Sequence, residues 1–264
     1  MTRAHDGFFE KNDAEIRRDI DESMSVRAST RLFGERERVA LACRILAERG
    51  HANTLAGQIT VRTEARDSFL TTNFELGFGE TSVGNLLRVD DEMGVLEGNG
   101  MANPALRFHM WIYKARPEVN CIVHTHPTYC SALSMTGEQL VVAHMDATMF
   151  YDDCAYLPEW PGVPVANEEG RIISAALGQK RSILLAHHGM LTAGKSLEEA
   201  VYLAVLLEQA AQQQILARSV GPIKPIPPVL AADAHSFMLS EKIVDATFVH
   251  WARGEARKYP EALR

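Results

Sequence analysis

The sequence predicts an α/β protein, namely an α/β/α sandwich around a mixed central sheet. Segments with the period of a strand alternate along the chain with segments that have the period of a helix. Two of the strand-like segments are continuously apolar, as is typical of strands buried on both faces of a sheet. The other strand-like segments are short and lie close together, which indicates a mixed sheet rather than an all-parallel one.

The composition is that of an ordinary globular protein. Of the 264 residues, 46% are hydrophobic and 23% are charged, so the chain is long enough to build a substantial core. The formal net charge is -7 and no block of Lys and Arg occurs, so we expect no nucleic-acid partner. No run of about 18 apolar residues occurs, so we expect no membrane partner either.

The N-terminal segment and the cysteines bear on the cellular compartment. The first residues are charged throughout and lack the apolar core of a signal peptide. The four cysteines, Cys43, Cys121, Cys130 and Cys154, have no CxxC spacing, and we interpret them as reduced thiols. We therefore expect a cytoplasmic protein.

We expect three parts along the chain. Residues 1–33 form an N-terminal helical arm, because residues 9–30 have helical character but carry many charges. Residues 34–220 hold the main domain. Residues 221–264 begin with the proline-rich connector GPIKPIPP and continue as an exposed helix over 232–256, packed on the same domain or on a neighbouring subunit.

The first half of the main domain begins with a helix. Residues 35–49 carry an apolar stripe, and Gly50 stands at the position that commonly ends such a helix. Short strands interrupted by a glycine-bearing loop follow at residues 58–62, 68–72, 86–90 and 94–98.

The second half of the main domain alternates helices with the two apolar strands. Asn103 and Pro104 suit the N-cap and the first position of a helix over 104–115. Ser196 and Glu199 form a capping box that opens a helix running to about residue 218. Between these helices we expect strands at 121–126 and 182–188 and helices at 128–135 and 168–178.

Both apolar strands end in histidines. His124 and His126 lie two residues apart, so both side chains point to the same face of the strand. The second strand ends in His187-His188-Gly189, and one histidine of this pair can join the first two if the strands are neighbours. Three neutral imidazoles suit Zn, Mn, Fe or Co and leave positions open for a substrate. The alternative interpretation is a set of half-buried histidines held by hydrogen bonds.

The sequence resembles the class II aldolase/adducin family over roughly residues 35–218. Three segments in the family's order and spacing carry the resemblance: RILAERGHANTLAGQITVR, ARPEVNCIVHTHPTYCSALS and SILLAHHGMLTAGKSLEEA. The resemblance implies a class II aldolase/adducin-like sandwich that binds a divalent metal, with Mn2+ as the first choice and Zn2+ as the second. It implies that His124, His126 and His188 are the metal ligands. It also implies a homotetramer with active sites at subunit interfaces.

The resemblance breaks down at the residues that aldol chemistry needs. Where the aldolases have Ser-Ser-Glu, this sequence reads Asn103-Pro104-Ala105. The glutamate of that triplet ligates the metal and moves the aldol proton, and Ala105 can do neither. Gln58 replaces an asparagine of one phosphate loop, and Glu75 stands where the other loop has a phosphate-facing glycine. A carboxylate there repels a phosphate dianion, so the sequence disfavours a sugar-phosphate aldolase.

The remaining site is suited to decarboxylation. A metal held by three histidines can chelate a ring hydroxyl oxygen and the adjacent carboxylate and accept electron density as CO2 leaves. Some members of the family are such decarboxylases, and the whole chain, including FFEKNDAEIRRDI and GFGETSVGNLL, resembles them. This resemblance implies a small-molecule substrate, an ortho-hydroxylated aromatic dicarboxylate. Two alternatives stay open: a class II aldolase or dehydratase on a small carbonyl substrate, and a non-enzymatic adducin-like module.

The other roles at this site are harder to assign. A substrate with two carboxylates needs a cation or several hydrogen-bond donors around it. The substrate-binding candidates are Gln58, Thr72, Asn73, Asn103 and Arg107. The candidates for the proton source are Glu75, Glu80, His144 and a metal-bound water, and the sequence does not choose among them.

Overall fold

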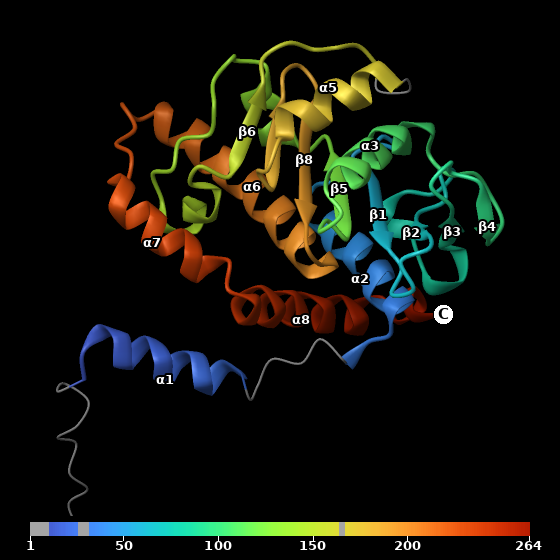
Figure 1. The fold of residues 1–264 in the computed structure, drawn as a ribbon, viewed down its shortest axis with the longest axis horizontal. Coiled ribbons are helices and arrows are strands. Elements are labelled where there is room, and N and C mark those ends of the chain that lie inside the picture. The colour runs from blue at the N-terminus through green and yellow to red at the C-terminus, as the bar shows by residue number, and fades with distance from the viewer. Residues whose placement is uncertain (1–10, 26–31, 164–166) are drawn as a thin grey trace, which may run out of the picture.

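A computed structural model describes residues 11–25, 32–163 and 167–264. Its centre is an eight-stranded sheet with the order β4-β3-β2-β1-β5-β8-β7-β6 (Figure 1). The strands are β1 (Gln58–Arg62), β2 (Phe69–Thr71), β3 (Leu87–Val89), β4 (Val95–Glu97), β5 (Cys121–Thr125), β6 (Cys154–Leu157), β7 (Ser182–Leu185) and β8 (Gly189–Gly194). β6 and β7 pair in parallel and the other neighbours are antiparallel, so the sheet is mixed.

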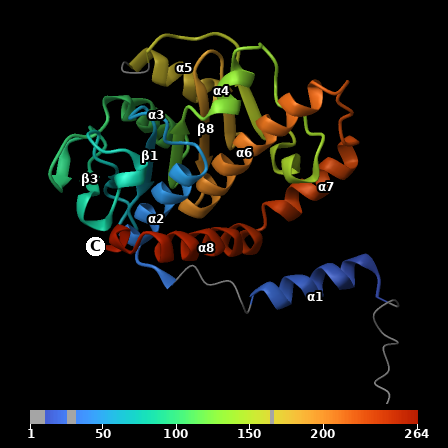
Figure 2. The same ribbon diagram turned by 180° about the vertical axis from the view of Figure 1, so that it is seen from behind.

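Helices cover both faces of this sheet (Figures 1 and 2). The helices of the described residues are α1 (Asp13–Ser25), α2 (Glu35–Glu48), α3 (Arg107–Ala115), α4 (Thr128–Ser134), α5 (Asn167–Leu177), α6 (Leu197–Arg218), α7 (Pro228–Met238) and α8 (Glu241–Lys258). Apolar residues of α2, α6 and α8 form one core with the sheet, and those of α3 and α5 form a second core on the other face. The predicted α/β/α sandwich is therefore confirmed.

The alternation of side chains along β5 separates the two cores. Cys121 and Val123 belong to the core under α2 and α6, whereas Ile122 belongs to the core under α3 and α5. By the same period His124 lies on the α3 side, where its ring is 5.1 Å from the ring of Phe108. The first metal-ligand candidate therefore comes from the central strands of the sheet.

The structure contains most of the elements that the sequence predicts, but two strands were missed. β6 has only four residues and lies at the edge of the sheet. β8 begins and ends with glycine and has no run of β-branched residues, so its pattern is weak. The strand expected over 182–188 ends at Leu185, because Ala186 to His188 turn the chain back into β8.

The prediction of one exposed helix over 232–256 is wrong. Two helices, α7 and α8, replace it, and α7 already begins at Pro228. The break lies at Leu239 and Ser240, where the extended backbone of Ser240 (φ -61°, ψ 135°) starts α8 as its N-cap residue. α8 is not exposed along its length, since Val244 and Phe248 are buried in the core that it shares with α2 and α6.

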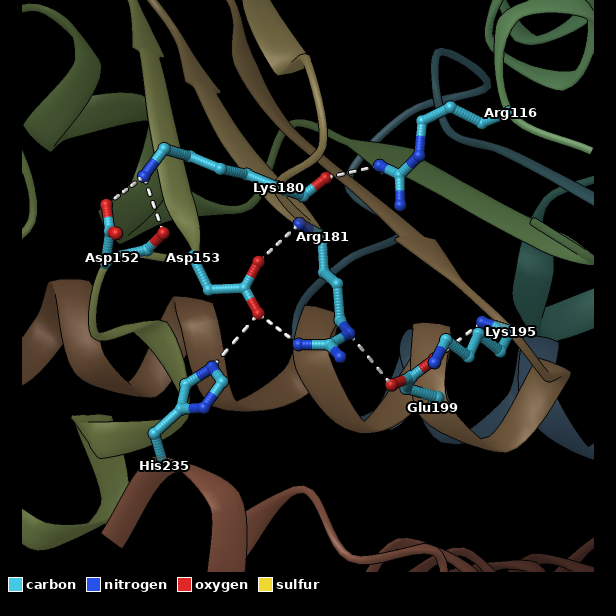
Figure 3. A network of polar contacts seen from close by, with 8 residues as sticks. All are labelled: Arg116, Asp152, Asp153, Lys180, Arg181, Lys195, Glu199 and His235. Carbon is cyan, nitrogen blue, oxygen red and sulfur yellow. Dashed lines mark hydrogen bonds and ion pairs between the residues drawn. The ribbon is translucent and has the colours of Figure 1, made fainter. Parts of the chain in front are cut away.

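A polar network fastens α6 and α7 to the β6–β7 edge of the sheet (Figure 3). The main-chain N–H of Arg181 donates to Asp153 at 2.7 Å, and the Arg181 guanidinium is paired both with Asp153 and, at 3.2 Å, with Glu199 of α6. His235 of α7 places its Nε2 atom 3.1 Å from the same Asp153 carboxylate. The buried carboxylate of Asp153, just before β6, thus contacts residues just before β7 and in α7, which are distant in sequence.

The N-terminal helix α1 lies apart from the sheet, alongside α8 (Figures 1 and 2). Arg17 of α1 donates to both carboxylate oxygens of Asp233 in α7, at 2.8 and 2.7 Å. Both side chains of this pair are more than half exposed, so we expect the contact to add little stability. The division of the chain into an arm, a main domain and a C-terminal part stays a prediction.

Candidate metal centre

Three histidines meet at one end of the central strands. His124 is the penultimate residue of β5, His126 follows that strand directly, and His188 lies in the turn between β7 and β8. Because β5 and β8 are neighbours in the sheet, the turn that carries His188 reaches the end of β5. The order of the strands therefore brings together the residues that the sequence placed far apart.

The geometry of the three side chains suits a single ion. Their ring centroids are 4.8 Å (His124–His126), 4.8 Å (His124–His188) and 4.6 Å (His126–His188) apart. One nitrogen from each ring lies within 4.8 Å of the other two, and the Nε2 atoms of His124 and His126 are 3.0 Å apart. Imidazole nitrogens bind zinc at about 2.0–2.1 Å, so three nitrogens at such separations can share one ion.

A main-chain contact selects the ligand atom of His124. Its Nδ1 atom lies 2.8 Å from the carbonyl oxygen of Met190 in β8. A carbonyl only accepts, so Nδ1 must carry the proton, and the lone pair of Nε2 is left for a metal. The nitrogen that is free is also the one that faces His126. The arrangement fits a histidine ligand whose tautomer is fixed by the protein.

Burial keeps these histidines neutral. Desolvation, followed by the neighbouring histidines, lowers the pKa of His124 well below its ordinary value. Desolvation also lowers the pKa of His126. The pKa of His188 is lowered to about 4, mainly by desolvation and further by the neighbouring His126. Neutral imidazole is the form that binds metals, so the site needs no deprotonation at neutral pH.

Two backbone features form the turn that carries His188. His187 has a left-handed backbone (φ +56°), which a residue other than glycine adopts only where the surroundings hold it. Gly189 lies so close to the end of β5 that an added Cβ atom would be 2.5 Å from the oxygen of Thr125 and 2.8 Å from the ring of His126. The close backbone approach that this glycine permits sets the distance between the two histidine-bearing segments.

A cavity of about 630 Å³ adjoins the histidines. Its lining residues are Thr54, Leu55, Ala56, Gln58, Phe74, Asn103, Pro104, Ala105, His124, His126, Trp160, Val163, His187 and His188. Among the described residues this lining contains no carboxylate, and apolar side chains make up much of its wall. Ala105, for which the family resemblance implies the position of the aldolase glutamate, is one of these wall residues.

Two of the predicted substrate-binding residues line this cavity. Gln58 lies opposite His124 in the β1–β5 pair; its amide N–H donates to the oxygen of Ala56 at 2.7 Å. The Gln58 Oε1 atom is buried and has no hydrogen-bond partner among the described residues. Asn103 accepts a hydrogen bond from the N–H of Ala105 at 2.9 Å and thereby caps the short helix that follows, as expected from the sequence.

The other three substrate-binding candidates do not line the cavity. Thr72 and Asn73 are buried, and the Asn73 side chain contacts the main chain of Asn99 and Met101, which holds the loop around them. Arg107 is exposed and lines a different cavity, which it shares with Trp111 of the same helix. The helical geometry explains this, because two residues after Ala105 the side chain points away from the histidines.

None of the three candidate proton donors lines the cavity within one chain. Glu75 is exposed, and Glu80 accepts a hydrogen bond from the N–H of Gly77 at 3.0 Å, which stabilises its own short helix. His144 accepts a hydrogen bond from the N–H of Asp146 at 3.2 Å at the start of another short helix, where it lines a separate groove. The side chains of Glu80 and His144 thus stabilise local structure.

Several residues that line the cavity could not be selected from the sequence. Thr54 and Leu55 belong to the loop before β1, Phe74 follows β2, and Trp160 and Val163 follow β6. These loops have no shared motif, and only the strand order brings them to the same end of the sheet. No sequence pattern pointed to Trp160, whose exposed ring is seen only in the folded chain.

The fold and the three histidines agree with the family to which the sequence matches. Residues 37–215 match the family described as Class II Aldolase and Adducin N-terminal domain. The match spans more than half of the chain, and the chain belongs to this family. Members of the class are generally dependent on a divalent metal, act on small molecules and often form tetramers.

Individual relatives carry out different reactions. The 3,4-dihydroxyphthalate decarboxylase of Arthrobacter keyseri is 31% identical over 206 residues, covering 74% of this chain and 83% of its own. A 4-hydroxy-3-prenylphenylpyruvate oxygenase/4-hydroxy-3-prenylbenzoate synthase of Streptomyces roseochromogenus is 32% identical, covering 74% and 72%. The structure of the L-fuculose 1-phosphate aldolase of Glaciozyma antarctica matches with a TM-score of 0.80 and 32% identity, covering 87% of this chain and 91% of that one.

These comparisons support a lyase built around the histidine site. The decarboxylase and the aldolase both cleave a carbon–carbon bond, although they act on different substrates. In the part of the chain that the structure describes, no helix is both long and apolar enough to cross a membrane.

Proposed function

We propose that this protein is a divalent-metal-dependent, non-oxidative decarboxylase of an ortho-hydroxylated aromatic dicarboxylate. The substrate that we propose is 3-hydroxy-2-methylpyridine-4,5-dicarboxylate, which yields 3-hydroxy-2-methylpyridine-5-carboxylate and CO2. The observation that carries the proposal is a cluster of three histidines beside a cavity whose described lining has no carboxylate and includes Ala105, where the family resemblance implies the aldolase base. The likeness to a decarboxylase of a hydroxylated aromatic dicarboxylate supports it.

The proposed roles of the histidines follow from their contacts. His124, His126 and His188 would hold the ion through one nitrogen each, and the main-chain oxygen of Met190 keeps the His124 ring in the required tautomer. A divalent metal there, Mn2+ before Zn2+, would supply positive charge for a ring oxygen and the adjacent carboxylate. Three protein ligands leave room for both substrate oxygens.

The cavity wall suits an aromatic acid better than a sugar phosphate. Ala105 provides no carboxylate to remove an aldol proton, and the described lining holds no Lys or Arg for a phosphate group. Gln58 and Asn103 are the polar side chains beside the histidines, and we propose that their amides contact the carboxylate that is retained. The volume of about 630 Å³ is ample for one substituted pyridine ring.

The reaction needs one proton on the ring carbon. The bond between that carbon and the carboxyl group breaks, its electron pair stays with the ring, and the proton takes the place of CO2. Because Glu75, Glu80 and His144 do not line the cavity, we propose that water entering through its open mouth delivers the proton. The chain's part in this step is to hold the ring where water can reach it.

The test is CO2 release from 3-hydroxy-2-methylpyridine-4,5-dicarboxylate by protein loaded with manganese. We expect stoichiometric CO2 and monocarboxylate, loss of both after treatment with a chelator, and recovery on adding Mn2+ back. Absence of CO2 release by the fully loaded protein contradicts the proposed substrate. A panel of ortho-hydroxylated benzoic and phthalic acids then decides whether the decarboxylase class itself is wrong.

An aldolase or dehydratase acting on a small carbonyl compound is the second candidate. The likeness to the Glaciozyma aldolase structure favours it, and the absence of a carboxylate at Ala105 opposes it. Cleavage of L-fuculose 1-phosphate, measured under the same metal loading, separates the two candidates. We expect none above the chelator-treated background.

A further inference from the structure

Three large apolar side chains lie exposed around the histidine cavity. Trp160 is 52% exposed, Val163 is 61% exposed and Leu55 is 46% exposed, and all three line the same cavity. Single exposed apolar residues are common on protein surfaces, but a group of them around a cavity marks a site of contact with a ligand or a protein. These three come from two separate loops, so their meeting is a property of the fold.

Trp160 differs from the other two tryptophans of the chain. The indole N–H of Trp111 donates to Asn167 at 3.3 Å, and the ring of Trp251 is stacked on Tyr202 with 6.3 Å between centroids. Among the residues that the structure describes, Trp160 has neither a hydrogen bond to its indole N–H nor a ring or cation contact. Among the described residues, a large aromatic face therefore has no partner beside a cavity that His124, His126 and His188 also line.

We propose that Trp160, flanked by Leu55 and Val163, is the surface on which the planar ring of the substrate stacks while the ring's oxygens face the histidines. The cavity lining combines nitrogen donors with an apolar wall, and an ortho-hydroxylated aromatic acid has the two matching parts. This inference rests on the proposed function, because it assigns the ring-binding wall of that same site. It makes Trp160 a specificity-determining residue.

The stacking distinguishes substrates that present the same oxygens. An acyclic hydroxy acid can offer a hydroxyl oxygen and a carboxylate to the histidine site, but it has no flat apolar face for Trp160. An aromatic acid gains both the burial of its ring and the favourable arrangement of two aromatic rings. We therefore expect the indole to change the affinity for the aromatic ligand by about tenfold and to leave the acyclic ligand unaffected.

The experiment is calorimetric titration of the manganese-loaded full-length protein with two probes. Salicylate and 3-hydroxypropanoate both place a hydroxyl oxygen three carbons along from the carboxylate oxygens, and only salicylate has a ring. We expect Trp160→Ala to weaken salicylate binding about tenfold and Trp160→Phe to weaken it less than about threefold. Binding of 3-hydroxypropanoate should be the same in all proteins, and Trp111→Phe is the matched control for loss of a tryptophan outside this cavity.

Several results would overturn the inference. They are equal salicylate binding in wild type and Trp160→Ala, an equal loss for both probes, and failure of salicylate to bind the loaded wild type. If Trp160→Ala forms a smaller oligomer than the wild type and binds salicylate equally well, Leu55, Trp160 and Val163 form a contact between subunits instead. Trp160→Leu, which keeps apolar bulk without a π face, should resemble Trp160→Ala and guards against a folding defect.

The CO2 assay run alongside separates this inference from the proposed function. If salicylate binding depends on Trp160 but no CO2 is released from the dicarboxylate, the stacking role of Trp160 stands and the proposed decarboxylase activity is contradicted. If CO2 is released but salicylate binding does not depend on Trp160, the proposed decarboxylase activity stands and the proposed stacking role of Trp160 is contradicted.

Discussion

The Nδ1 atom of His124 lies 2.8 Å from the main-chain oxygen of Met190, across the pairing of β5 with β8. The acceptor belongs to the backbone, so the orientation of the imidazole depends on the register of two strands and on no particular side chain. A ligand fixed in this way is ready for the ion before the ion arrives. The candidate metal site is thus part of the sheet, and the effects of changing the histidines can be separated from effects on the fold.

The first prediction concerns the histidines. His124→Ala and His188→Ala should each lose most of the bound manganese and at least about 100-fold in turnover, because two nitrogens hold the ion poorly. The protein should stay folded, with the circular dichroism spectrum of the wild type. Metal content by mass spectrometry of the dialysed protein is the measurement, and His187→Ala, which alters the neighbouring exposed ring, is the control and should keep its metal. Full metal content in His124→Ala would contradict the site.

The second prediction concerns Gly189. In Gly189→Ala the new Cβ atom meets the Thr125 oxygen at 2.5 Å and the His126 ring at 2.8 Å, so the turn must move away from β5. We expect a loss of about 1–3 kcal/mol in the free energy of unfolding and weaker metal binding. Chemical denaturation and manganese titration measure the two effects. Gly221→Ala is the matched control, since nothing lies within 4 Å of its added Cβ atom. Equal behaviour of the two variants would refute the close approach.

The third prediction concerns the network around Asp153. Asp153→Ala removes the partner of both Arg181 and His235 at the edge of the sheet, and we expect a loss of about 2–4 kcal/mol in the free energy of unfolding. Asp152→Ala removes an adjacent carboxylate that is paired with Lys180 but whose side chain is 88% exposed. That change should cost less than about 1 kcal/mol. Similar denaturation midpoints for the two variants would show that the network does not stabilise the fold.

The sequence was sufficient for the layers of the fold and for the set of histidines. The apolar runs of β5 and β7 are long enough to identify buried strands, and the spacing of His124 and His126 puts them on one face. It was insufficient for β8, whose pairing with β5 brings His188 within reach, because its glycine-bounded segment has little strand propensity. Without the family resemblance the choice between His187 and His188 depends on a backbone angle that no pattern reveals.

Strand pairing and helix geometry also explain why some of the predicted substrate-binding residues line the cavity and others do not. Gln58 lines the cavity because strand pairing puts it opposite His124, whereas Arg107 lies two residues past the cavity wall on a helix and points elsewhere. Proximity along the chain is a poor guide at a helix start, where consecutive side chains diverge by about 100°. Trp160 lies in an irregular loop after β6 and could be found only from the folded chain.

The fourth prediction concerns pH and Asp245. Burial, and then the nearby Glu198 and Glu241, raise the pKa of Asp245 to about 6 from its ordinary value of 3.8. The folded state therefore binds more protons than the unfolded state between these two pH values, so this group's contribution to stability falls as pH rises from about 4 to about 6. Asp245→Asn should be more stable than the wild type at pH 7 and should lose that advantage near pH 4. Melting temperatures across this range test it, with exposed Asp91→Asn as the control, and an advantage that does not depend on pH would contradict it.

The last prediction concerns Ala105. Ala105→Glu puts a carboxylate into the wall of the histidine cavity, where it can ligate the ion and occupy space that the aromatic acid needs. We expect tighter manganese binding and a loss of CO2 release of at least about tenfold, because the added ligand competes with the substrate oxygens. The variant should still not cleave L-fuculose 1-phosphate efficiently, since the described cavity lining offers no cation for the phosphate group. Ala105→Gln, which has the same bulk without the charge, separates crowding from ligation: it should lower CO2 release without strengthening metal binding. Efficient aldol cleavage by Ala105→Glu would mean that a single carboxylate is all that divides this site from an aldolase, and that our interpretation of the phosphate-binding loops is wrong.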